Sequence, residues 1–120
     1  MPNKNTVKIF VANTYYHVYS RGWNLNKIFR DESDYKYFEL LLMRAFAPEA
    51  VADERGRLYR NFYNDARLNA YCLMGNHFHL LVHIYDESGL SRAMKSILTS
   101  YSMYFNKKYK QRGKPVRVYV

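Results

Sequence analysis

The sequence predicts an α+β fold for its 120 residues, and three observations lead to that class. Two stretches carry apolar residues at helical spacing, and stretches rich in aromatic and β-branched residues precede and follow them, as expected of strands. Hydrophobic residues make up 48% of the chain and charged residues 24%, which is the composition of a globular domain. The length suits one domain, so we expect a single domain over residues 1–120.

The first half of the chain predicts a strand and a helix. The strand is expected at Tyr15–Arg21, with Val7–Val11 as its start or as a separate short strand. Acidic residues at 31–34 favour a helix N-terminus, and the helical spacing continues to Phe46. Pro48 marks its end, because the residue before a proline rarely stays helical. The stretch Leu58–Tyr63 is compatible with a strand or with a surface excursion.

The second half predicts a hairpin, a helix and a last strand. The strands Leu68–Met74 and His77–Tyr85 flank Gly75-Asn76, which suits a tight turn. A helix with an apolar stripe opens at 86–91 and continues to Phe105, and Val116–Val120 is the final strand. The order strand, helix, strand, strand, helix, strand is that of a ferredoxin-like βαββαβ domain, whose antiparallel sheet carries both helices on one face.

The charge balance indicates a polyanionic partner. Lysine and arginine number 19 against 10 acidic residues, which gives a formal charge of +9, and there are 13 tyrosines. A basic surface attracts nucleic acid, and tyrosine rings stack on unpaired bases. The alternative is a basic soluble domain whose tyrosines line the rim of the core.

Cysteine use and hydropathy restrict the cellular setting. The single cysteine, Cys72, excludes an internal disulfide and a cysteine zinc cluster, and we expect it to be buried and inert on its strand. No apolar run approaches the ~20 residues of a membrane span, and residues 1–5 contain no apolar stretch typical of a secretory signal. These features predict a cytoplasmic protein without a membrane partner.

His77 and His79 are the candidate metal ligands. They are separated by one residue on a predicted strand, so both side chains point to one face and Phe78 points to the other. Two imidazoles so placed can share a divalent ion. His83 lies on the same face, but ~13 Å further along the strand, too far to join them. A third ligand must come from elsewhere, and the alternative is a pair of surface histidines without metal.

These residues resemble a known family. The stretch from Tyr71 to Val82, with its His77-Phe78-His79 core, resembles the HUH single-strand nucleases, and more narrowly the single-tyrosine transposases that include the REP-associated tyrosine transposases (transposase IS200-like domain). The stretches at 16–22, 28–35 and 101–109 resemble the first strand, the entry to the first helix and the end of the second helix of that family.

The resemblance implies metal-dependent cleavage of single-stranded DNA that bears hairpins. In such enzymes the two histidines and a polar side chain hold Mg²⁺ or Mn²⁺, which polarises a phosphate. A tyrosine hydroxyl attacks it and forms a 5′-phosphotyrosine link, which a DNA 3′-hydroxyl later reverses. Family members work as dimers, and an unpaired final strand would make a homodimer by edge pairing plausible.

The sequence departs from the family at two points. Gly75 replaces a proline in the turn, a change that the turn should tolerate. The nucleophilic tyrosine and the third metal ligand normally lie on a helix after the last strand, and no residue up to Val120 aligns with that tyrosine. We therefore expect a domain that lacks its catalytic helix, as a truncated or decayed member or a fragment. Tyr104, and after it Tyr101, are the fallback nucleophiles within the chain.

Basic residues near the end of the first strand, on the second helix and in the segment that follows it are the candidate DNA contacts: Arg21, Lys27, Arg30, Lys95, Lys107, Lys108 and Lys110. Three functions stay open. The first is a DNA strand transferase, the second a single-stranded DNA or RNA binding module of the same fold that cannot cut. The third is a metal-binding or interaction domain without a nucleic-acid role, against which the charge of +9 argues.

Overall fold

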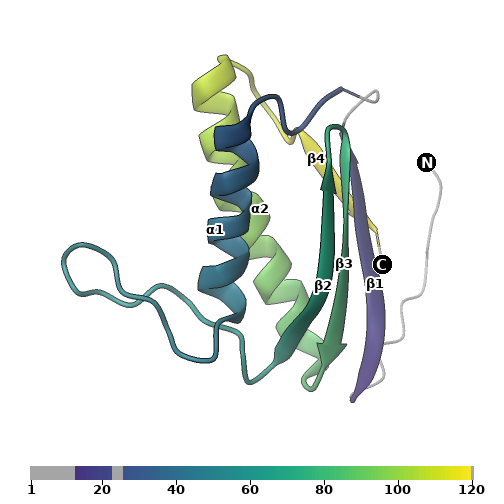
Figure 1. Ribbon diagram of the computed structural model, residues 1–120, viewed down its shortest axis with the longest axis vertical. Coiled ribbons are helices and arrows are strands. Elements are labelled where there is room, and N and C mark those ends of the chain that lie inside the picture. Colours follow the sequence, from purple (N-terminus) through teal and green to yellow (C-terminus); the bar gives the residue numbers. More distant parts are fainter. Residues whose placement is uncertain (1–12, 23–25, 120) are drawn as a thin grey trace.

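The computed structural model describes residues 13–22 and 26–119, and it confirms the predicted α+β class (Figure 1). Its six elements follow the predicted order. They are β1 (Thr14–Gly22), α1 (Glu32–Phe46), β2 (Ala66–Met74), β3 (His77–Ile84), α2 (Glu87–Tyr109) and β4 (Val116–Tyr119). The possible strand at Val7–Val11 falls outside the described residues.

The strands form one sheet in the order β2-β3-β1-β4, and every neighbouring pair is antiparallel. Both helices lie on the same side of this sheet (Figure 1). The order and the single helical layer are those of the ferredoxin-like fold. One face of the sheet is therefore covered by helices, and no helix or strand of the described residues covers the other, which we call the open face.

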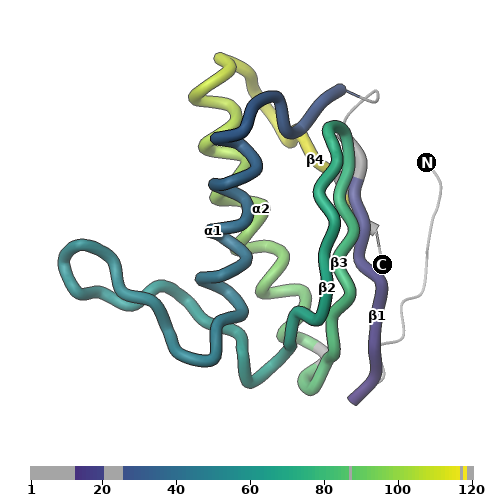
Figure 2. Tube along the Cα trace, viewed as in Figure 1, coloured from purple at the N-terminus to yellow at the C-terminus, as the bar shows by residue number. Residues whose placement is uncertain are grey.

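The segment between α1 and β2 is a surface excursion rather than a strand. Its one strand-like pairing joins Ala52 to Leu58, and the amide of Phe62 donates to the carbonyl of Ala45 at the end of α1. Figure 2 shows this excursion at the end of the molecule opposite the β2–β3 turn. Since His77 directly follows that turn, residues 47–65 lie far from the histidine pair.

The predicted acidic start of α1 is a capping box. The Asp31 side chain accepts the Asp34 amide proton at 3.0 Å, and the Asp34 carboxylate accepts the Asp31 amide proton at 3.4 Å. Such a cap contributes about 1 kcal/mol to helix stability. The prediction of a helix start at 31–34 is confirmed to within one residue.

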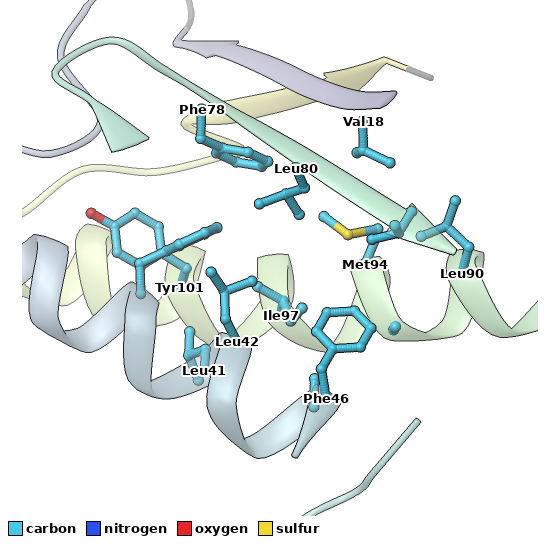
Figure 3. Close-up of a cluster of buried hydrophobic side chains, with 14 of the residues drawn as sticks. Val18, Leu41, Leu42, Phe46, Phe78, Leu80, Leu90, Met94, Ile97 and Tyr101 are labelled. Atoms are coloured by element: carbon cyan, nitrogen blue, oxygen red, sulfur yellow. The ribbon is translucent and has the colours of Figure 1, made fainter. Parts of the chain in front are cut away.

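The core lies between the helices and the sheet (Figure 3). The side chains of Val18 on β1 and of Phe78 and Leu80 on β3 are buried there against both helices. Successive strand residues alternate faces, so the odd-numbered residues of β1 and β3 point to the open face. All four histidines of the chain are among them: His17, His77, His79 and His83.

Candidate metal centre and nucleic-acid face

The candidate site lies on the open face, where β1 and β3 run side by side. Tyr19 is directly opposite His79 in the antiparallel register, and Arg21 is opposite His77. His17 is opposite Leu81, one row further along the same face. The pairing of β1 with β3 therefore brings His17 close to His77 and His79. His17 and His79, which are in contact, are 62 residues apart in the sequence.

His77 is oriented by its neighbour in the turn. Its Nδ1 lies 2.6 Å from Oδ1 of Asn76. An amide oxygen only accepts hydrogen bonds, so the His77 Nδ1 carries the proton and donates it. The other ring nitrogen, Nε2, then keeps its lone pair and can bind a metal ion.

His79 is oriented by a second histidine. Its Nδ1 lies 2.8 Å from Nε2 of His17, and the two rings stack with centroids 5.0 Å apart. One of these nitrogens donates and the other accepts. If His79 donates, its Nε2 keeps a lone pair, as in His77. In the tautomer in which His79 donates, both histidines of the predicted pair have Nδ1 engaged and a lone pair on Nε2.

The environment favours the neutral form of His79. Partial desolvation, and then the neighbouring His17 and His77, lower the pKa of His79 below its ordinary value of 6.5. A neutral imidazole is the form that binds a metal, because the proton and the ion compete for the same lone pair.

The two histidines of the predicted pair are neighbours on the open face. The rings of His77 and His79 have centroids 5.1 Å apart and lie nearly perpendicular. Among residues 13–22 and 26–119, no group of three or more His, Cys, Asp or Glu side chains is arranged to hold a metal. Imidazole nitrogen suits Mn²⁺ and later ions better than Mg²⁺, which prefers oxygen.

His83 is not part of this group. His83 lies on the same face as His79, two rows further along the sheet. Its ring stacks on Tyr15 with centroids 4.4 Å apart and also contacts the ring of Tyr85. The expectation that His83 lies too far along the strand to share an ion with His79 agrees with this placement.

The two fallback tyrosines lie on the other side of the sheet. Tyr101 is fully buried in the core (Figure 3), and its hydroxyl donates to the carbonyl of Ile28. Burial, and then the charge of Asp34, raise the pKa of Tyr101 well above its ordinary value. Tyr104 stacks on Tyr37 between the helices and donates to Asp34 at 2.6 Å. Neither hydroxyl faces the histidine pair, so neither suits attack on a phosphate held there.

Of the predicted DNA contacts, Lys108 is committed elsewhere. Its ammonium group lies 2.7 Å from Asp31 and 2.8 Å from Asp34, and hydrogen bonds to these two carboxylates raise the pKa of Lys108 above its ordinary value. This contact joins the C-terminal turns of α2 to the start of α1. Lys108 is therefore a structural residue in this arrangement.

The other predicted contacts lie at two places. Lys27 is exposed beside the β2–β3 turn, where the amides of Ile28 and Phe29 donate to the carbonyl of Gly75. Arg21 is paired with His77 in the register. The remaining exposed cations lie on the helical side of the molecule, with Arg30 packed over Phe105 and Tyr109: Arg30, Lys95, Lys107 and Lys110.

The prediction of a buried Cys72 is wrong. The side chain is exposed, and Cys72 pairs with His79 in the register. Tyr71 and Leu73 take the positions facing the helices, because a register shift between Leu68 and Ala70 reverses the alternation along β2.

The comparison with known families agrees with this geometry. The family model described as "Transposase IS200 like" matches residues 49–117, which is more than half of the chain and includes His77 and His79. The chain belongs to the IS200-like transposase family. Comparisons with curated proteins and with solved structures gave no match.

Membership of the IS200-like transposases supports a transposase-type function and DNA as the partner. No helix in the described part of the chain is long and apolar enough to cross a membrane. The predicted family is thus confirmed, whereas the residues of the site rest on the geometry described above.

His17 is the site residue that sequence reasoning missed. It lies outside the matched range, on a strand far from the histidine pair in sequence. The alternation of β1 places it on the open face, but its partner depends on the register between β1 and β3. That register follows from which residues of both strands are buried against the helices.

Proposed function

We propose that this chain is the core of a transposase that cleaves and rejoins single-stranded DNA in a metal-dependent reaction. The observation that supports this best is the pair His77 and His79 on the open face. Each has its Nδ1 in contact with a neighbouring side chain, and when both Nδ1 atoms donate, both Nε2 atoms have a lone pair for an ion. Neighbouring side chains that orient both rings favour metal binding over the alternative of two surface histidines without a metal.

His77 and His79 would hold the ion, and His17 and Asn76 would keep their rings in position. When bound, a divalent ion supplies Lewis-acid polarisation of a phosphate oxygen at this point. Lys27, exposed at the neighbouring turn, and the overall charge of +9 favour a phosphate backbone beside the pair.

The proposed reaction is a transesterification. A tyrosine oxygen attacks the phosphorus atom, and the bond between phosphorus and the DNA 3′ oxygen breaks. The tyrosine loses its proton to solvent, and the released 3′ oxygen takes up a proton from solvent to become a 3′-hydroxyl. The phosphate stays linked through its 5′ side to tyrosine, and attack by a DNA 3′-hydroxyl reverses the step. Tyr101 and Tyr104 are on the wrong side of the sheet, whereas Tyr19 faces the pair, with its ring 6.4 Å from that of His79.

A second function is a single-stranded DNA or RNA binding module that does not cut. The burial of the Tyr101 hydroxyl and the engagement of Tyr104 with Asp34 favour it, because they remove both fallback nucleophiles. The two functions share the fold and the charged surface, and they differ only in whether a covalent intermediate forms.

The proposed partner is hairpin-bearing single-stranded DNA in the cytoplasm, and a homodimer is proposed through the edge of β4. In the described sheet β4 pairs only with β1, which leaves its other edge for a second strand. Light scattering of the purified chain at several concentrations would show a monomer if this pairing does not occur.

A covalent-adduct assay separates the two functions. Labelled hairpin-bearing single-stranded DNA is mixed with the protein and Mn²⁺ and then run on a denaturing gel. A metal-dependent adduct would establish cleavage, and peptide mapping would name the tyrosine. Binding without an adduct would support the binding module. Absence of both at low salt would contradict the proposed function.

A further inference from the structure

A second group of side chains lies on the open face, away from the histidine pair. Tyr15 on β1 and Arg67 on β2 are each paired with His83 on β3, so the three form one row across the sheet. His83 is four positions after His79, which corresponds to ~13 Å along the strand. The row therefore lies on the same surface as the proposed cleavage site, further along β3.

The side chains of this row form a continuous aromatic surface. The rings of Tyr15 and His83 are stacked with centroids 4.4 Å apart and an interplanar angle of 11°. The ring centroids of Tyr85 and His83 are 4.5 Å apart. The Arg67 guanidinium lies 3.9 Å above the Tyr63 ring and 5.0 Å from that of Tyr85. We call these five residues the aromatic row.

The aromatic row does not serve the core. Tyr15, His83 and Arg67 lie on the face of the sheet opposite the helices, and Tyr15 is 57% exposed and Tyr85 40% exposed. A group of large exposed rings of this kind marks an interaction surface. The rings hold one another in place, so a ligand that stacks on them meets a partly ordered surface and loses little side-chain freedom.

The charge of this region fits a nucleic acid. Arg67 is the cation of the row, and its Nε donates to the carbonyl of Tyr63, which fixes the guanidinium over the rings. Two carboxylates close in sequence to the row, Asp65 and Asp86, are both paired with Arg92, at 3.1 and 3.8 Å. An unpaired base can stack on the exposed ring of Tyr15 while Arg67 meets a phosphate.

We propose that the aromatic row stacks the unpaired bases that flank the phosphate held at His77 and His79, an inference that rests on the proposed function. The occupant is a single-stranded DNA segment that runs along β1 and β3. Stacking accepts any base, so this surface supplies affinity and alignment on one side of the cleavage site without selecting a sequence.

An abasic scan tests this directly. Binding is measured by fluorescence anisotropy in the presence of EDTA, so that the result does not depend on metal or cleavage. The probe is a hairpin with a single-stranded flank, and one base at a time is removed from the flank. The intact chain should lose about tenfold in affinity at one or two adjacent positions, as expected for a lost base stack.

Tyr15→Leu should bind the complete flank about tenfold more weakly, and removal of the sensitive bases should then have no further effect. Tyr15→Phe should keep the pattern of the intact chain, because it keeps the ring. Tyr71→Leu is the matched control, since Tyr71 is 46% exposed but sits on the helical side of β2. It should leave the pattern unchanged.

Three results would overturn the inference. The first is an unchanged abasic pattern in Tyr15→Leu, and the second is an intact chain that does not bind the flank at all. The third is a changed oligomeric state of Tyr15→Leu with unchanged DNA binding, which would make this surface a contact between two copies. Failure of the adduct assay alone would affect the proposed cleavage and leave the aromatic row intact.

Discussion

His17 on β1 and His79 on β3 are in direct contact, with Nε2 of the first 2.8 Å from Nδ1 of the second. The contact crosses the sheet diagonally, because the residue directly opposite His79 is Tyr19. It gives the ring of His79, a proposed metal ligand, a hydrogen-bond partner on the Nδ1 side, a place that carboxylates and carbonyl groups take in many metal sites. His17 is thus a positioning residue for the proposed ion.

Loss of His17 should weaken metal binding without removing a ligand. His17→Ala is expected to lower the affinity for Mn²⁺ by about 10-fold to 100-fold, the usual effect of losing a partner behind a ligand. His17→Gln, which can still hydrogen bond, should recover part of the loss. Isothermal titration with Mn²⁺ and without DNA measures this. His83→Ala is the control and should bind Mn²⁺ as the intact chain does. If His17→Ala and His17→Gln also bound Mn²⁺ as tightly as His83→Ala, the positioning role of His17 would be ruled out.

Acid should destabilise the fold through Asp34. Burial alone would raise the pKa of this carboxyl, but hydrogen bonds from Lys108, Tyr104 and Tyr109 lower it well below its usual range. A lowered pKa in the folded state means that the stabilisation is present above the unfolded value of about 3.9 and is lost as the pH falls below it.

The matched variant is Asp34→Asn. It should cost about 2 kcal/mol at pH 7, since hydrogen bonds to a charged group are removed, and its stability should fall less between pH 5 and pH 3. Urea unfolding at each pH supplies both numbers. Parallel losses in the two proteins on acidification would show that Asp34 does not carry the effect.

The hydroxyls of Tyr101 and Tyr104 should matter for stability and not for DNA chemistry. Tyr101→Phe removes the hydrogen bond to Ile28, and Tyr104→Phe removes one to Asp34. Each should lower the free energy of unfolding by about 1 kcal/mol. The yield of covalent adduct should stay the same. A variant that folds normally and forms no adduct would identify its tyrosine as the nucleophile.

Gly89 should be intolerant of alanine although it lies in the first turns of α2. A Cβ at this position would sit 2.2 Å from Cβ of Asp65, so the helix or the segment before β2 has to move. The expected loss is about 1–3 kcal/mol despite the better helix propensity of alanine. Ser91→Ala, at an exposed position of the same helix, should be neutral or slightly stabilising in thermal unfolding. A stabilised Gly89→Ala would contradict the close packing.

The order of elements could be predicted from the sequence because each depends on local patterns. The alternation at His77–Ile84 specifies a strand and its buried face. The acidic residues before α1 specify where that helix begins. The exposure of Cys72 could not be predicted in this way. It depends on a register shift in β2, which moves every later side chain to the other face.

Contacts between distant segments were also beyond local patterns. Lys108 resembles a surface cation in sequence, yet the packing of α2 against α1 places it 2.8 Å from the buried Asp34. His17 likewise gains its role only when β1 and β3 pair. His77 and His79 could be proposed as metal ligands from the sequence because they share a strand, whereas the contact of His79 with His17 could not, because His17 lies on another strand.

We propose that His77 and His79 hold a metal ion against a phosphate of single-stranded DNA. The most direct measurement is the affinity for hairpin-bearing single-stranded DNA with Mn²⁺ and with EDTA, in the intact chain and in a His77→Ala/His79→Ala variant. Mn²⁺ should tighten binding by the intact chain and have no effect on the variant, whose affinity in EDTA should match that of the intact chain. Equal tightening in both proteins would show that the ion binds elsewhere and would contradict the claim.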